Sequence, residues 1–237
     1  MNKIAIMGAM PEEIAPLLEY FKDIKATKYA SNVYYETSYN NINIVIAYSK
    51  IGKVFSALTT TILIEKFKCD IVLFSGVAGA INKNLKIGDI VVATKTAQHD
   101  LDITSFGHEI GFVPEGSKFI NMNKKLINIA IDVAKTNNIS LKKAIVATGD
   151  QFVAHENRKK FIFDNFQADA IEMEGASVAV VCHSLNIPLL IIRSISDTAD
   201  TDAGFDFDKF LDSSANISAK LMITIVAYIS KNIKKLN

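Results

Sequence analysis

Residues 70–80 read DIVLFSGVAGA, and this stretch decides the fold. The apolar run within Asp70–Ser75 predicts one continuous buried strand, with small residues directly after it. Similar buried strands are predicted at Lys3–Met7 and Leu189–Ser194, and helical spacing of apolar residues fills much of the chain between them. Strands that alternate with helices in one unbroken chain predict an α/β fold with a largely parallel, twisted sheet.

The other predicted elements continue this alternation. Further strands are predicted at Val33–Thr37 and Asn43–Tyr48, which form a hairpin around Asn40 and Asn41, and at Gly88–Ala93 and Lys143–Ala147. Helices are predicted at Glu12–Phe21, 53–67, Asn123–Thr136 with a left-handed cap at Asn137-Asn138, about 174–185 and about 207–233. No linker or repeat is visible, so residues 1–237 are interpreted as one three-layer domain, a mixed, mostly parallel sheet flanked by helices.

Composition excludes several classes of function. Of the 237 residues 49% are apolar and 22% are charged, and the net charge of +1 offers no basic surface for nucleic acid. No run of 18 apolar residues predicts a membrane helix, and the first residues do not have the pattern of a signal peptide. Cys69 and Cys182 lie far apart in apolar contexts, as reduced core cysteines do. We expect a soluble, cytoplasmic protein.

Polar or glycine-rich motifs follow five of the predicted strands. They are GAMPEE (8–13), SGVAGA (75–80), TGDQFV (148–153), IEMEG (171–175) and RSISD (193–197). In α/β folds ligands bind beyond the carboxyl ends of the strands. One such end is unremarkable, because glycine and aspartate are common in turns. Five in one chain predict a shared pocket.

The motif IEMEG places two glutamates where a buried strand ends. Alternation along a strand would put Glu172 and Glu174 on one side and Met173 on the other. Buried carboxylates are costly unless they are paired, so these residues are either exposed or face a polar occupant.

Taken together, the motifs resemble those of one enzyme family. The five strand ends, with GDIVV (88–92) and HDLDITSFG (99–107), occur in the order found in bacterial 5′-methylthioadenosine/S-adenosylhomocysteine nucleosidases. The resemblance covers about residues 3–210 and extends to the nucleoside phosphorylase-like superfamily and its aminodeoxyfutalosine nucleosidases. It implies hydrolysis of the bond between adenine and a modified ribose, in methionine salvage or menaquinone biosynthesis, and no cofactor.

The resemblance also assigns roles to the acidic residues. It implies that Asp197 protonates the leaving adenine, that Ser196 and Arg193 support it, and that Glu13 activates the attacking water. A general acid is typically worth about 10²–10⁴ in rate, and a raised pKa would keep Asp197 protonated near neutral pH. The structural alternatives are a helix cap at Ser196 and Asp197 and helix-dipole contacts of Glu12 and Glu13. We expect the dipole role only for Glu12.

The ribose, purine and 5′-substituent are assigned in the same way. The resemblance implies that Glu174 accepts hydrogen bonds from the ribose hydroxyls, and an ionised carboxylate can accept both. It places the remaining binding residues as follows: Glu172 and Met173 at the ribose, Phe152, Val153 and Phe207 at the purine, Met10, Ile51, Ala78 and Gly79 along the walls, and Ile103 and Phe106 in the 5′-substituent pocket of a partner subunit. The last pair implies a homodimer.

Two other functions remain open. A phosphate-dependent nucleoside phosphorylase needs donors for a multiply charged anion. At the positions where such enzymes carry an arginine and a serine, this chain has Phe74 and Val77, and its first loop is acidic. Val77 also replaces a serine that is frequent in the nucleosidases. A non-catalytic nucleoside-binding protein would not need both Glu13 and Asp197.

A metal site is not expected. His99 and His108 lack the carboxylate–histidine spacing of metal-binding motifs. Asp200 and Asp202 are interpreted as surface or cap residues, and residues 200–210 are expected to influence the choice of 5′-substituent.

Overall fold

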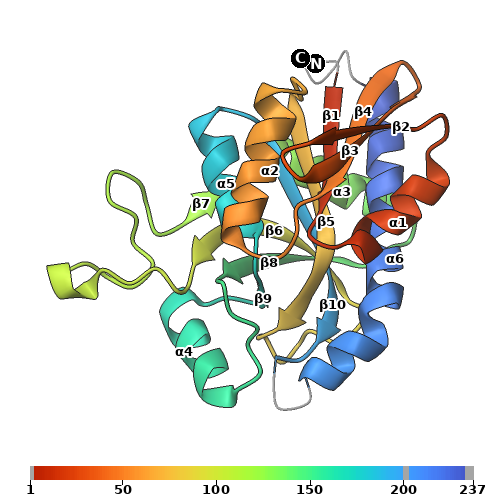
Figure 1. Ribbon diagram of the computed structural model, residues 1–237. Coiled ribbons are helices and arrows are strands. Elements are labelled where there is room, and N and C mark those ends of the chain that lie inside the picture. The colour runs from red at the N-terminus through yellow and green to blue at the C-terminus, as the bar shows by residue number, and fades with distance from the viewer. Residues whose placement is uncertain (1–2, 200–202, 233–237) are drawn as a thin grey trace.

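A computed structural model describes residues 3–199 and 203–232 of the chain. Asp200 and Asp202 therefore lie outside the described residues. A central sheet is flanked by helices on both sides, as expected for a mixed α/β domain (Figure 1). No helix in the two described ranges is long and apolar enough to cross a membrane.

The strand at the centre of the sheet is β5 (Ile71–Ala80), and every one of its residues is buried. It pairs in parallel with β1 (Lys3–Gly8) on one side and with β10 (Leu189–Asp197) on the other. Burial from both sides explains its continuous apolar run, because neither face meets water. The strands predicted at Lys3–Met7, Asp70–Ser75 and Leu189–Ser194 are confirmed, and the structure shows them to be neighbours.

On the side of β1, the sheet continues into a meander. β4 (Ile42–Tyr48) pairs in parallel with β1, and β3 (Asn32–Tyr39) and β2 (Lys25–Tyr29) follow as antiparallel strands. The predicted hairpin is confirmed, with Asn40 and Asn41 at positive φ in its turn. β2 was not predicted, because its mostly exposed residues carry no apolar pattern.

On the side of β10, the strands close into a ring. β10 pairs antiparallel with β6 (Ile90–Gln98), β6 pairs in parallel with β8 (Leu141–Thr148), and β8 pairs in parallel with β9 (Ala170–Glu172). β9 returns antiparallel to β5, at Gly79 and Ala80. The ring was not predicted, since its closure depends on pairings between distant segments. A short strand, β7 (Ile120–Asn121), pairs antiparallel with β6.

The helices pack in two groups. α2 (Lys53–Glu65) lies against α5 (Gly175–Ser184), whereas α6 (Ala203–Asn232) packs on β5, on β10 and on α1 (Pro11–Tyr20). α3 (Lys124–Thr136) also contacts α6, and Asn138 after its end has φ +55, which confirms the left-handed cap. The sheet thus lies between two helical layers (Figure 1).

Two features of the chain were not predicted as elements. α4 (Glu156–Phe166) buries only Ile162 and Phe166, so it lacks the apolar stripe that identifies most helices. Residues 99–119 form an arm that projects from the body, with the short 3-10 helix η1 (Thr104–Phe106) at its tip (Figure 1).

Ile192 tests the ring closure, because this fully buried residue of β10 pairs with Ser75 of β5 and Val92 of β6. Ile192→Ala should lower the free energy of unfolding by about 2–5 kcal/mol and Ile192→Val by only about 0.5–1.5 kcal/mol. Denaturant unfolding of the three proteins measures the series. Equal, small losses in both variants would contradict tight packing at this junction.

Candidate active site

The five motif-bearing strand segments surround one pocket of about 300 Å³. The prediction that they share a pocket is confirmed. The lining residues include thirteen that were predicted from sequence: Met10, Glu13, Ile51, Ala78, Gly79, Phe152, Val153, Glu172, Met173, Glu174, Ser196, Asp197 and Phe207. Its size and its mixture of apolar walls with a few polar groups are typical of small-molecule sites.

β5 and β10 run further than expected, into the pocket itself. SGVAGA belongs to β5 and does not follow it, because β10 continues to pair along these residues as far as Gly79. Small residues are needed there for a steric reason. A Cβ on Gly76 would lie 2.6 Å from Glu13 Oε1, and one on Gly79 would lie 2.6 Å from Asp197 Oδ1. The glycines allow carboxylates to approach the strand.

The carboxylate of Glu13 folds back from the first turn of α1 onto the ends of two strands. Its Oε2 accepts the backbone N–H groups of Ala9 and Met10, the latter at 3.1 Å, and its Oε1 accepts the N–H of Val77 at 2.9 Å. Burial raises the pKa of Glu13, although Arg193 and these N–H donors oppose the rise. A buried carboxylate with a raised pKa is suited to accept a proton.

The Glu172 carboxylate is occupied by protein donors. Its Oε2 accepts from Arg193 Nη2 at 2.7 Å and from the Gly175 N–H at 2.7 Å, and its Oε1 accepts from the Thr148 hydroxyl. The N–H of Glu174 also approaches Oε2, at 3.2 Å. This carboxylate therefore anchors the start of α5, and it has little capacity left to bind a ribose as the sequence analysis expected.

Arg193 lies behind the pocket and does not line it. The side chain is 1% exposed, and its guanidinium carbon lies 4.0 Å from the centre of the Phe74 ring. Its ion pair with Glu172 supplies the positive charge that a buried carboxylate needs. Arg193 thus supports the site indirectly, through its ion pair with Glu172.

Glu174 occupies the N-cap position of α5 without a capping side-chain bond and presents its carboxylate to the pocket. Its Oε1 accepts the backbone N–H of Gly52 at 2.8 Å. Burial, together with the negative charges of Glu172 and Glu13, raises the pKa of Glu174 to about 8, against the opposing effects of the Gly52 N–H and Arg193. Of the pocket glutamates, Glu174 has the fewest donors among the described residues.

The strict strand alternation expected for residues 172–174 does not hold. β9 ends at Glu172 and α5 begins at Gly175, so the backbone turns between them. Met173 consequently lines the same pocket as the two glutamates.

Asp197 ends β10 beside a register shift that follows Ile195. Its Oδ2 accepts from the Ser196 hydroxyl at 2.9 Å and its Oδ1 from the Ala199 N–H at 2.9 Å. Asp197 as a whole residue is 3% exposed. Ser196 therefore orients this group, as the sequence analysis expected.

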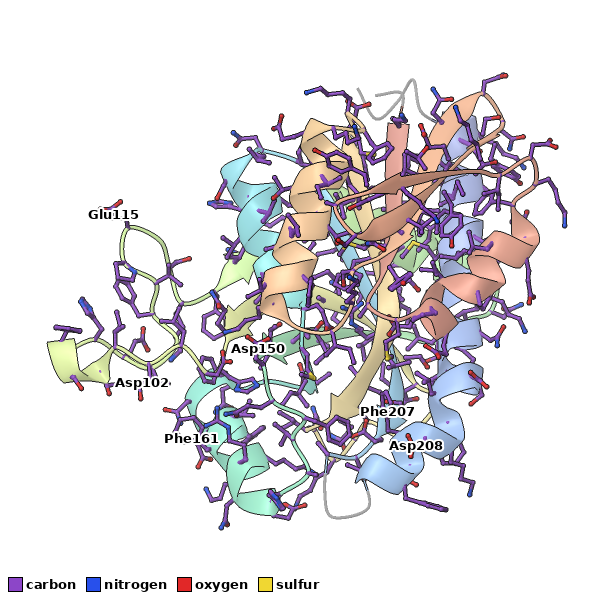
Figure 2. All side chains as sticks on the ribbon, in the orientation of Figure 1. Asp102, Glu115, Asp150, Phe161, Phe207 and Asp208 are labelled. Atoms are coloured by element: carbon purple, nitrogen blue, oxygen red, sulfur yellow. The ribbon has the colours of Figure 1, made fainter. Side chains whose placement is uncertain are left out.

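Two aromatic rings line the pocket together with the glutamates. Phe152 and Phe207 meet edge to face, with ring centres 5.6 Å apart. Figure 2 shows Phe207 on the first turns of α6, below Asp150 in that view. Val153 is buried beside them, in the small apolar cluster under α4.

Ile103 and Phe106 are not brought to this pocket. They lie on the projecting arm, where Phe106 is 81% exposed. Four lining residues were missed: Ala9, Val77, Gln151 and Ile171. Each lies inside a motif already singled out, so motif membership was the available signal. Within the described residues no three His, Cys, Asp or Glu side chains group as a metal site.

Comparison with known proteins places this geometry in a family. The model of the phosphorylase superfamily matches residues 3–229. The chain belongs to the phosphorylase superfamily.

Its relatives within the superfamily are nucleosidases. An aminodeoxyfutalosine nucleosidase of Campylobacter jejuni is 54% identical, over 94% of this chain and 97% of that protein. A 5′-methylthioadenosine/S-adenosylhomocysteine nucleosidase of an Exiguobacterium strain is 37% identical, over 94% and 97%. The crystal structure of the Helicobacter pylori enzyme of that name, with butyl-thio-DADMe-Immucillin-A, superposes with a TM-score of 0.95 at 48% identity, covering 96% of this chain and 99% of the other.

The raised pKa of Glu174 has a consequence for stability. Between pH 4.5 and about 8 the folded chain keeps a proton that the unfolded chain has lost, so this group lowers stability progressively as the pH rises through that window. Glu174→Gln removes the effect. The variant should match the wild type near pH 4.5 and melt several degrees higher at pH 8.5, by calorimetry. A melting difference that does not change with pH would contradict the assignment.

Proposed function

We propose that this chain hydrolyses the N-glycosidic bond of adenine nucleosides with a modified 5′ position. The candidates are 6-amino-6-deoxyfutalosine, 5′-methylthioadenosine, S-adenosylhomocysteine and 5′-deoxyadenosine. The observation that carries the proposal is that Glu13, Glu174 and Asp197 line one buried pocket together with Phe152 and Phe207. The 54% identical relative makes aminodeoxyfutalosine the first substrate to test.

The proposed chemistry uses one acid and one base. Asp197 donates a proton to the imidazole ring of adenine as the bond from C1′ to the purine breaks, and adenine leaves as a neutral molecule. Glu13 accepts a proton from water as the water oxygen bonds to C1′. The ionised form of Glu174 stabilises the cationic sugar of the transition state, as carboxylates do in glycosidases, so activity requires loss of the proton that the folded chain keeps below about pH 8.

The environment of Glu13 favours water over phosphate as the nucleophile. A phosphate at this strand end would need the backbone donors of Ala9, Met10 and Val77. The Glu13 carboxylate already occupies all three, and its charge would repel a second anion. The same arrangement explains how Val77, in place of a serine, is compatible with the site: its backbone N–H, not its side chain, makes the polar contact.

We further propose a homodimer formed through α2 and the arm. α2 exposes Val54, Phe55 and Leu58, of which Val54 is 77% exposed, and Phe106 stands out at the tip of the arm. Apolar groups of this size in one region are typical of a protein interface. In such a dimer, Ile103 and Phe106 would complete the 5′-substituent pocket of the partner.

A cytoplasmic location, without metal or cofactor, is part of the proposal. The proposal is supported by Cys69 and Cys182, which are free and buried, with the pKa of both thiols raised by burial to about 12, as in core cysteines that form no disulfide. Methionine salvage and menaquinone biosynthesis are the pathways in which such an activity would act.

Adenine release from 6-amino-6-deoxyfutalosine and 5′-methylthioadenosine, with and without phosphate, tests the reaction. We expect equal rates and a free sugar as the product. In Asp197→Asn, turnover should fall by about 10²–10⁴ because the general acid is lost, while nucleoside binding persists. A phosphate requirement with a sugar 1-phosphate product would establish a phosphorylase instead. Binding without turnover in the wild type would indicate a binding protein.

The dimer can be tested by charge placement on α2. Val54→Lys should dissociate the dimer at micromolar concentration, because a buried lysine without a partner is costly. Sedimentation velocity measures the change, with Tyr228→Lys on the exposed face of α6 as the control. A wild-type monomer, or a Val54→Lys dimer of unchanged strength, would contradict this interface.

A further inference from the structure

Three charged residues outside the pocket lining form a closed ring of contacts. Lys53 Nζ lies 2.7 Å from Asp100 Oδ1, Asp100 Oδ2 accepts the backbone N–H of Asp150 at 2.8 Å, and Asp150 Oδ1 accepts the backbone N–H of Lys53 at 2.8 Å. The ring joins the start of α2, the segment after β6 and the loop after β8. We call it the Lys53–Asp100–Asp150 ring.

The Lys53–Asp100 pair is less exposed than an ordinary surface ion pair, whereas Asp150 is exposed. The side chains of Lys53 and Asp100 are only 19% and 14% exposed. Burial would raise the pKa of Asp100, but the Lys53 ammonium and the Asp150 N–H hold it below its usual value. Lys53 donates to both aspartates, Asp100 accepts from Lys53 and from Asp150, and Asp150 donates its own N–H while it accepts that of Lys53, so these bonds tie the three segments together.

One side of the ring lies next to the only backbone donor that Glu174 has among the described residues. Gly52 precedes Lys53, and its N–H binds Glu174 Oε1 at 2.8 Å. Gly52 has φ +98, and a Cβ on it would lie 2.9 Å from Asp150 Oδ1. The Asp150 carboxylate therefore binds the Gly52–Lys53 peptide, which directly follows the Ile51–Gly52 peptide whose N–H Glu174 accepts.

The other side of the ring holds the loop that carries Phe152 and Val153. Asp150 opens this loop, and the preceding Gly149 donates its N–H to the backbone oxygen of Glu172 at 3.2 Å. Figure 2 shows Asp150 between the lower end of α2 and the loop above Phe207. Asp150 thus binds the segment before α2 through its carboxylate and belongs to the adenine loop through its backbone, without lining the pocket.

We propose that Asp150 is a positioning residue that aligns Glu174 with the ribose hydroxyls while it fixes the adenine loop. The inference rests on the proposed function for its consequence in catalysis. Asp150 acts through the Lys53 N–H on the Gly52–Lys53 peptide and thereby on the adjoining Ile51–Gly52 peptide, and it does not touch the nucleoside.

Loss of this alignment has an electrostatic signature. The groups that face Glu174 are Glu172 from β9, Glu13 from α1, Arg193 from β10 and the Gly52 N–H from α2. Of these, the Gly52 N–H and Arg193 hold its pKa down. A displaced Gly52 raises that pKa further, so productive binding, which uses the ionised carboxylate, moves to higher pH.

Two variants test the role of Asp150. Asp150→Ala removes the acceptor, whereas Asp150→Asn keeps an oxygen that can accept the Lys53 N–H. In Asp150→Ala, kcat/KM for 5′-methylthioadenosine should fall about 10- to 100-fold, as a displaced catalytic group implies. For the 3′-deoxy analogue of 5′-methylthioadenosine, the loss of kcat/KM should be smaller. The acidic limb of the pH profile of kcat/KM should move to higher pH. Asp150→Asn should restore most of the rate, and Asp164→Ala, at an exposed ion pair of α4, should match the wild type.

Hydrogen exchange of the peptide spanning residues 49–58 gives a readout without turnover. Its backbone amides should exchange faster in Asp150→Ala and at the wild-type rate in Asp150→Asn. Unchanged exchange in Asp150→Ala overturns the proposal. So does a loss of kcat/KM that is equal for 5′-methylthioadenosine and its 3′-deoxy analogue, or equal in Asp150→Ala and Asp150→Asn. If the wild type hydrolyses no nucleoside, the proposed function fails, and the exchange data still decide whether Asp150 holds Gly52.

Discussion

The need to bury four carboxylates beside one guanidinium constrains the whole site. Glu13, Glu172, Glu174 and Asp197 are each less than 10% exposed, and Arg193 is already paired with Glu172. Buried charges persist only where donors compensate them. The chain supplies these donors mainly from its backbone, at helix starts and strand ends.

This compensation is uneven, and the unevenness separates the roles. Glu172 has an arginine, a hydroxyl and backbone donors, which suits an anchor. Glu13 has three N–H donors but a raised pKa, which suits a group that gains a proton. Among the described residues Glu174 has one N–H donor, so hydroxyl donors from a ligand would find it under-satisfied. The number of donors around each of these chemically identical side chains is what distinguishes their proposed functions.

Local patterns in the sequence predicted the elements that are buried on two sides and the motifs at their ends. Asp70–Ser75 and Leu189–Ser194 were found because continuous apolar runs identify such strands. The exposed β2 and the weakly apolar α4 carry no comparable pattern. Alternation also failed at Met173, where a helix begins. The hydrogen bonds that occupy the Glu172 carboxylate could not be predicted. Its partners Thr148 and Arg193 are distant in sequence, and they meet only through the ring of strands.

The ring closure has a consequence for synthesis of the protein. β5 is made early, but its partner β10 and the strand β9 emerge from the ribosome only after most of the chain. Until then, β5 and β6 present apolar edges that can pair with other chains. Long-range pairing of this kind also slows folding. Synthesis of the segment that carries Asp197 thus ends the period of aggregation risk. Truncation before this segment would leave an open sheet whose unpaired edges are prone to aggregation.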